Sequence, residues 1–296
     1  MKNNYTGIGL ALLAVLIWSG NFIVARGVIR QIPPVSLAFY RWITAAAIIY
    51  PIAQKKFALE WKQVKQSWQY LLWSALTGIA LFNTFVYIGA HYTTAINLAL
   101  IGTTSSPIIA VLLARIFLKE NIGILKILGM ILCITGVLFL LSKGNIQNLL
   151  SLRFTRGDGW VLLAAVSFAI YNTLARKKPA ALSPMVYLSA IFCIGALLLL
   201  PVYLWEMSTA APVEWNMSLV LSILFLGLGA SVISFLCWNL AISKLGAGRT
   251  ALFGNLIPVF TSIEAVLFLG EAFTCIHIIS MALVFAGILL ANLRQR

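Results

Sequence analysis

One apolar run of the sequence reads Ala95-Ile-Asn-Leu-Ala-Leu-Ile-Gly-Thr-Thr-Ser-Ser-Pro-Ile-Ile-Ala-Val-Leu-Leu-Ala-Arg-Ile-Phe-Leu-Lys-Glu120. It has the length of a helix and carries Pro107 at its centre. The same design returns 151 positions later, where the run from Gly246 to Glu271 has Pro258 at its centre. A hydrophobic segment interrupted at mid-length, once in each half of a chain, is typical of binding sites inside the membrane.

The composition places the whole chain in a membrane. Of its 296 residues, 61% are hydrophobic and only 9% are charged, and the mean hydropathy is +0.99. Soluble domains carry about a quarter charged residues, so this chain cannot cover a surface exposed to water. The composition therefore predicts an integral membrane protein whose surroundings are a lipid bilayer.

The net charge of +14 does not indicate nucleic-acid binding. Lys and Arg residues occur singly in short connections, without a basic face or an interleaved aromatic platform. Such basic residues control the orientation of membrane helices. We therefore expect no nucleic-acid partner.

Ten apolar runs of about 17 to 25 residues are long enough to cross a hydrocarbon core of about 30 Å. In lipid the backbone must satisfy its own hydrogen bonds, so each run is predicted to be a helix. The first follows Met1-Lys2-Asn3-Asn4; it is too long for a typical signal peptide, and we expect it to be retained. The runs lie near 7–28, 35–53, 69–90, 95–117, 123–141, 158–175, 183–205, 218–241, 248–270 and 274–293.

The loop charges predict the orientation. With the N-terminus inside, fifteen of the 21 Lys and Arg residues fall on the cytoplasmic side and five on the outer side. This bias predicts that both termini are cytoplasmic. The connection 142–157 is the exception, because it carries three basic residues on the outer side.

The two halves of the chain are related by an internal repeat. Residues match at a nearly constant offset of 150 or 151, too often for chance. Each copy holds five predicted helices, an odd number, so the second copy should be inverted relative to the first. The predicted organisation is a repeat at 1–142, a periplasmic loop at 143–157 and an inverted repeat at 158–296. The matched pairs include Pro34/Pro184, Pro51/Pro201, Gly78/Gly229, Pro107/Pro258 and Glu120/Glu271.

These residues resemble the drug/metabolite transporter superfamily, and within it the EamA-type members with two five-helix repeats. The resemblance covers essentially the whole chain and rests on Leu16-Ile-Trp-Ser-Gly-Asn-Phe-Ile-Val-Ala-Arg26, the two proline-centred helices and the closing Leu-Lys-Glu120 and Leu-Gly-Glu271. It implies a multi-pass carrier of the bacterial inner membrane, commonly an exporter of amino acids or related metabolites, working by alternating access. Phe168-Ala-Ile-Tyr-Asn172 departs from the usual pattern, which leaves open whether the first helix of the second repeat makes the same contacts.

Enzymatic chemistry fits the sequence poorly. No two acidic residues form a paired acid/base site within a predicted span, and no phosphate-binding loop for ATP occurs. His91 and His277 are isolated, and the four cysteines fall singly in apolar runs, without metal or disulfide spacing. We expect no enzyme activity, no cofactor and no metal.

The two central prolines are candidate hinges. Pro107 cannot donate to the carbonyl of Thr103, and Pro258 cannot donate to that of Gly254. These carbonyls, with Asn255 beside the second, are either polar handles for a substrate or groups that neighbouring Ser, Thr or water satisfies. The sequence favours neither interpretation.

Two charges lie inside predicted spans. Glu264 is about 9 Å beyond Pro258 at 1.5 Å per residue, and Arg41 lies at a similar depth on the outer side. Charges at this depth are costly unless they are paired or face water, and they indicate function by default. We expect Arg41 and Glu264 either to form an ion pair or to line the cavity and hold the carboxylate and ammonium of a zwitterion.

Aromatic and amide side chains supply the other candidate binding residues. A buried amide in lipid needs a partner, which directs it to the bundle interior. Each aromatic residue taken singly is as well explained by packing; together with the amides they predict a moderately polar cavity for a small amphipathic solute. The set is Trp18, Asn21, Tyr40, Asn83, Tyr87, Asn97, Phe168, Tyr171, Asn172 and Trp238.

The fifth and tenth spans carry small residues, such as Gly129, Gly136, Gly287 and Ala291. Small residues let helix backbones approach closely. We expect these two helices to pack against each other or against another copy of the chain, and the sequence leaves open whether the protein is a homo-oligomer.

The leading prediction is a secondary transporter that exports a small metabolite, with an amino acid as the best guess. The alternatives are a passive uniporter or facilitator and, less favoured, a membrane sensor or scaffold that transports nothing. The twin interrupted helices argue against the scaffold.

Overall fold

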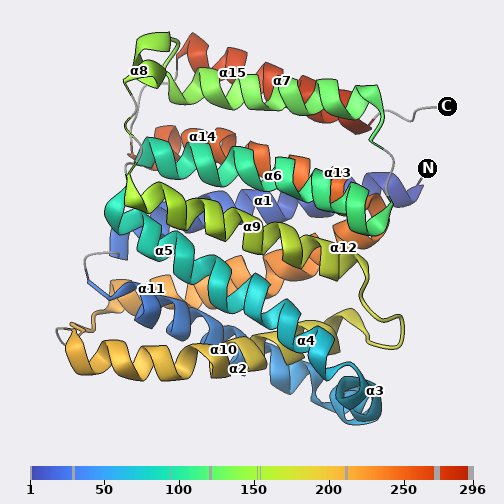
Figure 1. Cartoon of the computed structure of the whole chain (residues 1–296). Coiled ribbons are helices and arrows are strands. Elements are labelled where there is room, and N and C mark those ends of the chain that lie inside the picture. The colour runs from blue at the N-terminus through green and yellow to red at the C-terminus, as the bar shows by residue number, and fades with distance from the viewer. Residues whose placement is uncertain are drawn as a thin grey trace.

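The computed structural model describes residues 2–28, 31–93, 95–119, 122–151, 153, 155–210, 213–269 and 274–292. Across these residues the regular secondary structure is helical throughout, arranged as one bundle of helices that run roughly parallel or antiparallel (Figure 1). The elements are α1 (Lys2–Val28), α2 (Pro34–Leu59), α3 (Trp61–Gln66), α4 (Trp68–Ala75), η1 (Leu76–Leu81), α5 (Phe82–Tyr92), α6 (Ala95–Leu118), α7 (Ile124–Leu141), α8 (Ile146–Leu150), α9 (Arg156–Arg176), α10 (Pro184–Thr209), α11 (Met217–Leu224), η2 (Phe225–Ile233), α12 (Ser234–Leu245), α13 (Ala247–Leu252), η3 (Phe253–Leu256), α14 (Ile257–Leu269) and α15 (Cys275–Asn292).

Six helical stretches in the described residues are long and apolar enough to cross a membrane. This supports the all-helical, multi-pass architecture predicted from composition. The predicted total of ten spans remains a prediction. The six stretches are Pro34–Leu59, Trp68–Tyr92, Ile124–Leu141, Arg156–Arg176, Pro184–Thr209 and Met217–Leu245.

Helices α2 and α10 pack against each other, and each ends on an acid that caps the other. The Glu206 carboxylate, near the end of α10, accepts hydrogen bonds from the Val35 N–H (3.1 Å) and from the N–H and hydroxyl of Ser36 (2.6 and 2.8 Å). At the opposite end, Glu60 accepts one from the Ser183 N–H (2.8 Å). A carboxylate at a helix N-terminus satisfies free N–H groups and complements the helix dipole. The two caps fix α2 and α10 in antiparallel register.

Helices α7 and α15 pack along their length at one edge of the bundle (Figure 1). A Cβ atom added to Gly287 would lie 2.6 Å from the Gly129 carbonyl oxygen and 2.7 Å from the Cys133 sulfur. The two backbones approach closely because these positions have no side chain. The prediction that these two spans pack against each other is confirmed.

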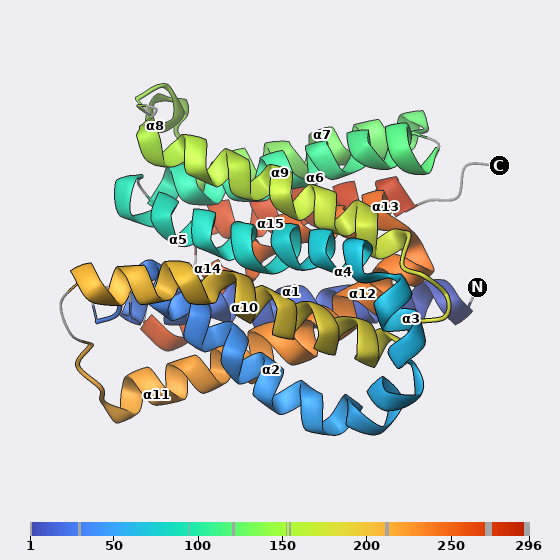
Figure 2. The same cartoon turned by 60° about the horizontal axis from the view of Figure 1, so that its bottom comes forward.

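The two ends of the bundle carry different elements of the chain. In both views the start of α1 and the end of α15 lie at the same end as α3, and α8 lies at the other end (Figures 1 and 2). The chain thus brings both termini to one side, as the loop charges predict. Which compartment that side faces remains a prediction.

The two proline-centred segments differ in the structure. Helix α6 continues through Pro107 without interruption. The second segment is divided into α13, the 3₁₀ turn η3 and α14, with Pro258 as the second residue of α14. The expectation of a matched pair of broken helices is therefore wrong. In the second copy the Gly254 carbonyl accepts from the Ile257 N–H, so the 3₁₀ turn supplies the donor that Pro258 lacks.

Two long helices widen into π-helical segments, η1 between α4 and α5 and η2 between α11 and α12. They contain Gly78 and Gly229, a pair matched at offset 151. π-Helical turns inside α-helices occur frequently at functional sites. The sequence showed the glycine pair but not the altered hydrogen bonding. Glu120 and Glu271, which close the two proline-centred segments, lie outside the described residues.

Candidate functional site

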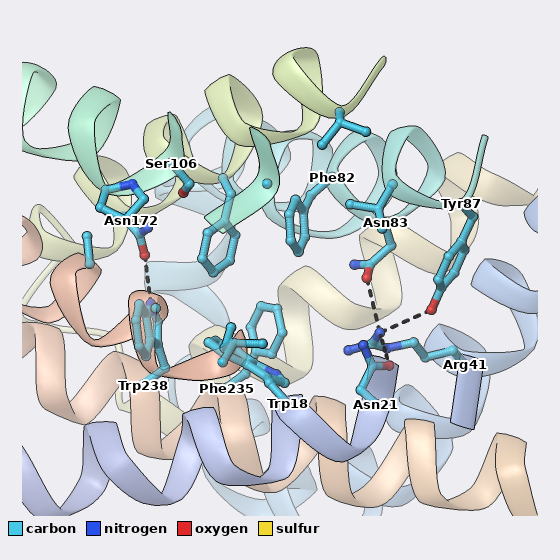
Figure 3. A pocket seen from close by; sticks show the side chains of 18 residues that line it. Trp18, Asn21, Arg41, Phe82, Asn83, Tyr87, Ser106, Asn172, Phe235 and Trp238 are labelled. Atoms are coloured by element: carbon cyan, nitrogen blue, oxygen red, sulfur yellow. Dashed lines mark hydrogen bonds between the residues drawn. The ribbon is translucent and has the colours of Figure 1, made fainter. Parts of the chain in front are cut away.

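A cavity of about 100 Å³ lies inside the bundle, lined by residues from both halves of the chain (Figure 3). Eight of the predicted binding residues and the predicted hinge Pro107 are among them. The lining residues are Trp18, Asn21, Arg41, Phe82, Asn83, Val86, Tyr87, Gly102, Ser106, Pro107, Val161, Phe168, Asn172, Phe235, Trp238, Ala251, Gly254 and Ile257.

Arg41 forms one end of the cavity, and its side chain is 2% exposed. The terminal nitrogen Nη1 donates to Asn21 Oδ1 (3.2 Å), Asn83 Oδ1 (3.0 Å) and the Tyr87 hydroxyl (3.2 Å). Figure 3 shows these three side chains converging on the guanidinium. Helices α1, α2 and α5 thus each supply part of a single polar cage.

The π-helical segment η2 completes this cage from the second half of the chain. Arg41 Nε donates to the Ser231 hydroxyl (2.8 Å), and Nη2 donates to the Ala230 carbonyl (3.0 Å). The same carbonyl accepts from the Trp18 indole N–H (2.8 Å). A π-helical turn shifts the usual backbone pairing, and here the Ala230 carbonyl accepts from two side chains.

The cage is electrically neutral apart from Arg41. Its five hydrogen-bond partners are two amides, two hydroxyls and a carbonyl. Guanidinium has five N–H donors, two of them on Nη2, and Nη2 has one acceptor here. Within the described part of the chain, the cavity therefore presents a positive charge without a counter-ion and with spare donor capacity.

The predicted ion pair between Arg41 and Glu264 is not formed among the described residues. Glu264 accepts instead from the Ser19 hydroxyl (2.7 Å), and it is not among the residues that line the cavity. Ser19 and Trp18 are neighbours on α1, so they point in directions about 100° apart. Glu264 contacts α1 through Ser19, whereas the cavity is lined by Trp18 and Asn21.

Asn172 and Trp238 form the opposite end of the cavity. The Trp238 indole N–H donates to Asn172 Oδ1 (2.7 Å), and the Ser106 hydroxyl lies near this pair (Figure 3). Asn172 and Trp238 are both 1% exposed. This end is polar, buried and uncharged.

Aromatic rings line the space between the two polar ends. Phe82 and Phe168 stack with their ring centres 4.4 Å apart. Trp18 contacts Phe235 and Trp238 at 5.6 and 4.9 Å between ring centres. The cavity therefore has an apolar middle suited to a flat hydrocarbon group.

Several predicted binding residues do not line the cavity. The Tyr40 hydroxyl shares a hydrogen bond with Tyr203 (2.7 Å), and the Tyr171 hydroxyl accepts from Asn239 Nδ2 (2.5 Å). Tyr40 and Tyr171 directly neighbour Arg41 and Asn172, which do line it. Consecutive residues on a helix point about 100° apart, and the hydrogen bonds to Tyr203 and Asn239 hold the Tyr40 and Tyr171 side chains outside the lining.

Asn255 and Pro258 also lie away from the lining. Asn255 is fully buried and its amide nitrogen donates to the Leu252 carbonyl (3.0 Å), which keeps its side chain within its own turn. The Pro258 carbonyl accepts from the Ser262 hydroxyl (2.9 Å). The side chains of Thr103 and Asn97, both predicted for the site, lie outside the described residues.

Some site residues had no part in the predicted set. Phe235 lies three residues before Trp238, on the same helix face, and Phe82 directly precedes Asn83, so both had a local signal. Ser231 and Ala230 had none, because their contacts with Arg41 cross about 190 positions of sequence.

Comparison with known proteins identifies the family. The model of the EamA-like transporter family matches the chain twice, over residues 5–142 and 155–293. The chain belongs to the EamA-like transporter family. The resemblance noted from the sequence is confirmed, and this family membership agrees with a multi-pass membrane protein.

Similar proteins extend over nearly the whole chain. An uncharacterized transporter of Bacillus subtilis, YyaM, is 29% identical over 97% of this chain and 94% of its own length. An uncharacterized transporter of Archaeoglobus fulgidus is 28% identical over 99% of both chains. A probable amino-acid metabolite efflux pump of Salmonella typhimurium is 26% identical over 94% of this chain and 92% of its own.

A solved crystal structure has the same fold. It superposes with a TM-score of 0.79 at 18% sequence identity, covering 98% of this chain and 96% of the other. At that identity the likeness concerns the fold alone.

Proposed function

We propose that the EamA-like chain is a secondary transporter that exports a small carboxylate-bearing metabolite across the bacterial inner membrane. Amino acids and related compounds are the first candidates. Transport proceeds by alternating access around a site at the bilayer midplane. The proposal is supported by the family match and by the efflux pump among the similar proteins.

The proposed architecture is ten spans in two inverted five-helix repeats, at 1–142 and 158–296, joined by a periplasmic loop at 143–157. Three features support it. The family model matches twice, and the caps on α2 and α10 are reciprocal. In addition, each repeat packs a helix against the first helix of the other repeat. Helix α5 packs on α9, and α12 packs on α1.

One observation carries the choice of a carboxylate: Arg41 is buried in the cavity wall with only neutral partners. A buried charge without a counter-ion is costly. A substrate carboxylate would supply that counter-ion and bind the guanidinium through charge-assisted hydrogen bonds. Charged residues inside membrane spans commonly mark the path or binding site of a substrate or ion.

Counterflow in proteoliposomes tests the function. Vesicles loaded with an unlabelled compound are diluted into the labelled one, across a panel of amino acids, sugars and nucleosides. We expect accumulation stimulated by the trans compound for one carboxylate-bearing class. Flux without trans stimulation would instead indicate a passive facilitator.

Arg41→Gln tests the role of the charge. Removing one partner of a buried charge pair costs about 2–5 kcal/mol, so substrate affinity should fall roughly 30-fold or more. Arg41→Lys keeps the positive charge but loses the paired donors of the guanidinium. Its substrate affinity should lie between those of the wild type and Arg41→Gln. Arg156→Gln, at an exposed position, is the matched control. Wild-type transport by Arg41→Gln would contradict the proposed role.

A further inference from the structure

The amide groups at the two ends of the cavity have fixed orientations. Arg41 only donates, so the Asn83 oxygen must face it (3.0 Å). The Trp238 indole also only donates, so the Asn172 oxygen must face that ring (2.7 Å). Donor-only partners settle which amide atom is oxygen and which is nitrogen. Both amide nitrogens must therefore point elsewhere.

Those two nitrogens have no hydrogen-bond partner among the residues that the structure describes. Asn83 Nδ2 and Asn172 Nδ2 are both buried and unpaired, on side chains 4% and 1% exposed that line the cavity. A buried donor without an acceptor is costly, and such groups in a native structure call for an explanation. Together with Arg41 they give the cavity unfilled donors at both ends (Figure 3).

Apart from the Ser106 hydroxyl, the side-chain oxygens of the described lining already accept a hydrogen bond. Arg41 donates to the oxygens of Asn21, Asn83 and Tyr87, and the Trp238 indole N–H donates to the Asn172 oxygen. No Asp or Glu occurs among the described lining residues. A substrate ammonium would add a second positive charge beside Arg41 without a carboxylate to meet it. Ring faces attract cations only weakly by comparison with a carboxylate.

We propose, building on the transport function proposed above, that the substrate is an aryl carboxylate without a free ammonium group. Its carboxylate binds Arg41 and Asn83 Nδ2. Its ring occupies the aromatic middle of the cavity, and an uncharged oxygen at its far end accepts from Asn172 Nδ2. A hydroxyl oxygen suits that end, because its proton can be donated to Ser106.

Three matched compounds test the assignment in counterflow. They share one phenol ring: 3-(4-hydroxyphenyl)propionate carries a carboxylate, tyrosine carries a carboxylate and an ammonium, and tyramine carries the ammonium alone. We expect the propionate to be transported, and tyrosine and tyramine about 10- to 100-fold more slowly, because an unpaired charged donor is costly. Removing the phenol oxygen, as in 3-phenylpropionate, should slow transport about 2- to 10-fold. Equal transport rates for 3-phenylpropionate and 3-(4-hydroxyphenyl)propionate would overturn the assignment of Asn172 as the partner of the far oxygen.

Asn83→Asp tests the charge balance without changing the shape of the cavity. It would place a carboxylate 3.0 Å from Arg41 Nη1, supplying the counter-ion from the protein itself. Transport of the propionate should fall at least roughly tenfold while the protein stays folded. Asn216→Asp is the control, since Asn216 is an exposed N-cap of α11 and Asp caps equally well. Wild-type transport by Asn83→Asp would overturn the inference.

The outcomes separate this inference from the proposed function. If tyrosine or another amino acid moves at least as fast as the propionate, the inference fails and the exporter of amino acids stands. If only sugars or nucleosides are transported, the inference and the proposed carboxylate substrate both fail, and a transporter of another substrate class remains. If no compound in either panel moves, both the inference and the transport function fail.

Discussion

Arg41 is held by residues that no local pattern joins. Asn21, Asn83 and Tyr87 were predicted from their residue types, as polar groups that must avoid lipid. Their convergence on one guanidinium depends on the crossing of α1, α2 and α5. The sequence therefore predicted the members of the cage, but neither of its two alternatives for Arg41 with Glu264, an ion pair or a shared cavity lining, is found in the described residues. The ion pair was expected because Arg41 and Glu264 carry opposite charges at a similar depth in the membrane.

Glu264 has a separate role to test. It is half-buried, one carboxylate oxygen accepts from Ser19, and the other is buried without a partner. If transport is coupled to protons, this carboxylate is the group in the described spans suited to carry one. We expect Glu264→Gln to abolish accumulation driven by a pH gradient and to retain counterflow, because exchange needs no net proton movement.

The control for Glu264→Gln is Glu214→Gln, a matched change at an exposed loop position. Uptake should be measured with and without an imposed pH gradient. Gradient-driven accumulation that survives in Glu264→Gln would exclude this residue as the proton carrier.

Among the elements, the contact of α7 with α15 was predicted most directly. Small residues at helical spacing indicate close packing whatever the partner, and the two spans that carry them proved to be each other's partners. The proline-centred segments were predicted less well. Proline excludes one hydrogen bond, but whether the helix continues or divides depends on neighbouring residues and packing. Helix α6 continues, and its counterpart divides at η3.

The close packing of α7 and α15 leads to a stability prediction. In Gly287→Ala the new methyl group meets backbone atoms, the Gly129 oxygen at 2.6 Å and the Cys133 nitrogen at 2.8 Å. Backbone cannot move aside as a flexible side chain can, so we expect a loss of about 1–3 kcal/mol. The measurement is the thermal unfolding midpoint in detergent.

Gly159→Ala provides the opposite case. Gly159 is a helical glycine with no atom within 4 Å of an added Cβ. Alanine there should be neutral or stabilising by about 0.5–1 kcal/mol, through its better helix propensity. If Gly287→Ala were as stable as Gly159→Ala, the close contact of α7 with α15 would be disproved.

For the whole molecule, the orientation in the membrane follows from the two ends of the bundle. Helix α3, with Lys62 and Lys65, lies at the end that holds both termini, and α8 lies at the other (Figure 1). The positive-inside rule predicts that the α3 end faces the cytoplasm. In intact cells, an impermeant maleimide should label Gln147→Cys on α8 and spare Lys65→Cys on α3.

Both labelling variants are to be made with Cys133, Cys193, Cys237 and Cys275 replaced by Ser. Both positions are exposed, so permeabilised cells should label both and serve as the control. Labelling of Lys65→Cys alone in intact cells would reverse the orientation.

The sequence by itself determined the membrane environment, the helical class and the family, because these depend on composition, on run length and on motifs within single segments. It also indicated which polar residues would be buried, since lipid excludes them wherever they occur along a span. Only the tertiary structure decided which of them share a cavity. Adjacent residues such as Tyr171 and Asn172 point in different directions, and Arg41 meets Ser231 from 190 positions away. Helix rotation and crossing set those contacts, and both arise from packing across the whole chain. The proline-centred runs at Ala95–Glu120 and Gly246–Glu271 thus revealed the repeat, whereas the uncompensated guanidinium and the two free amide donors became visible only when the helices were assembled.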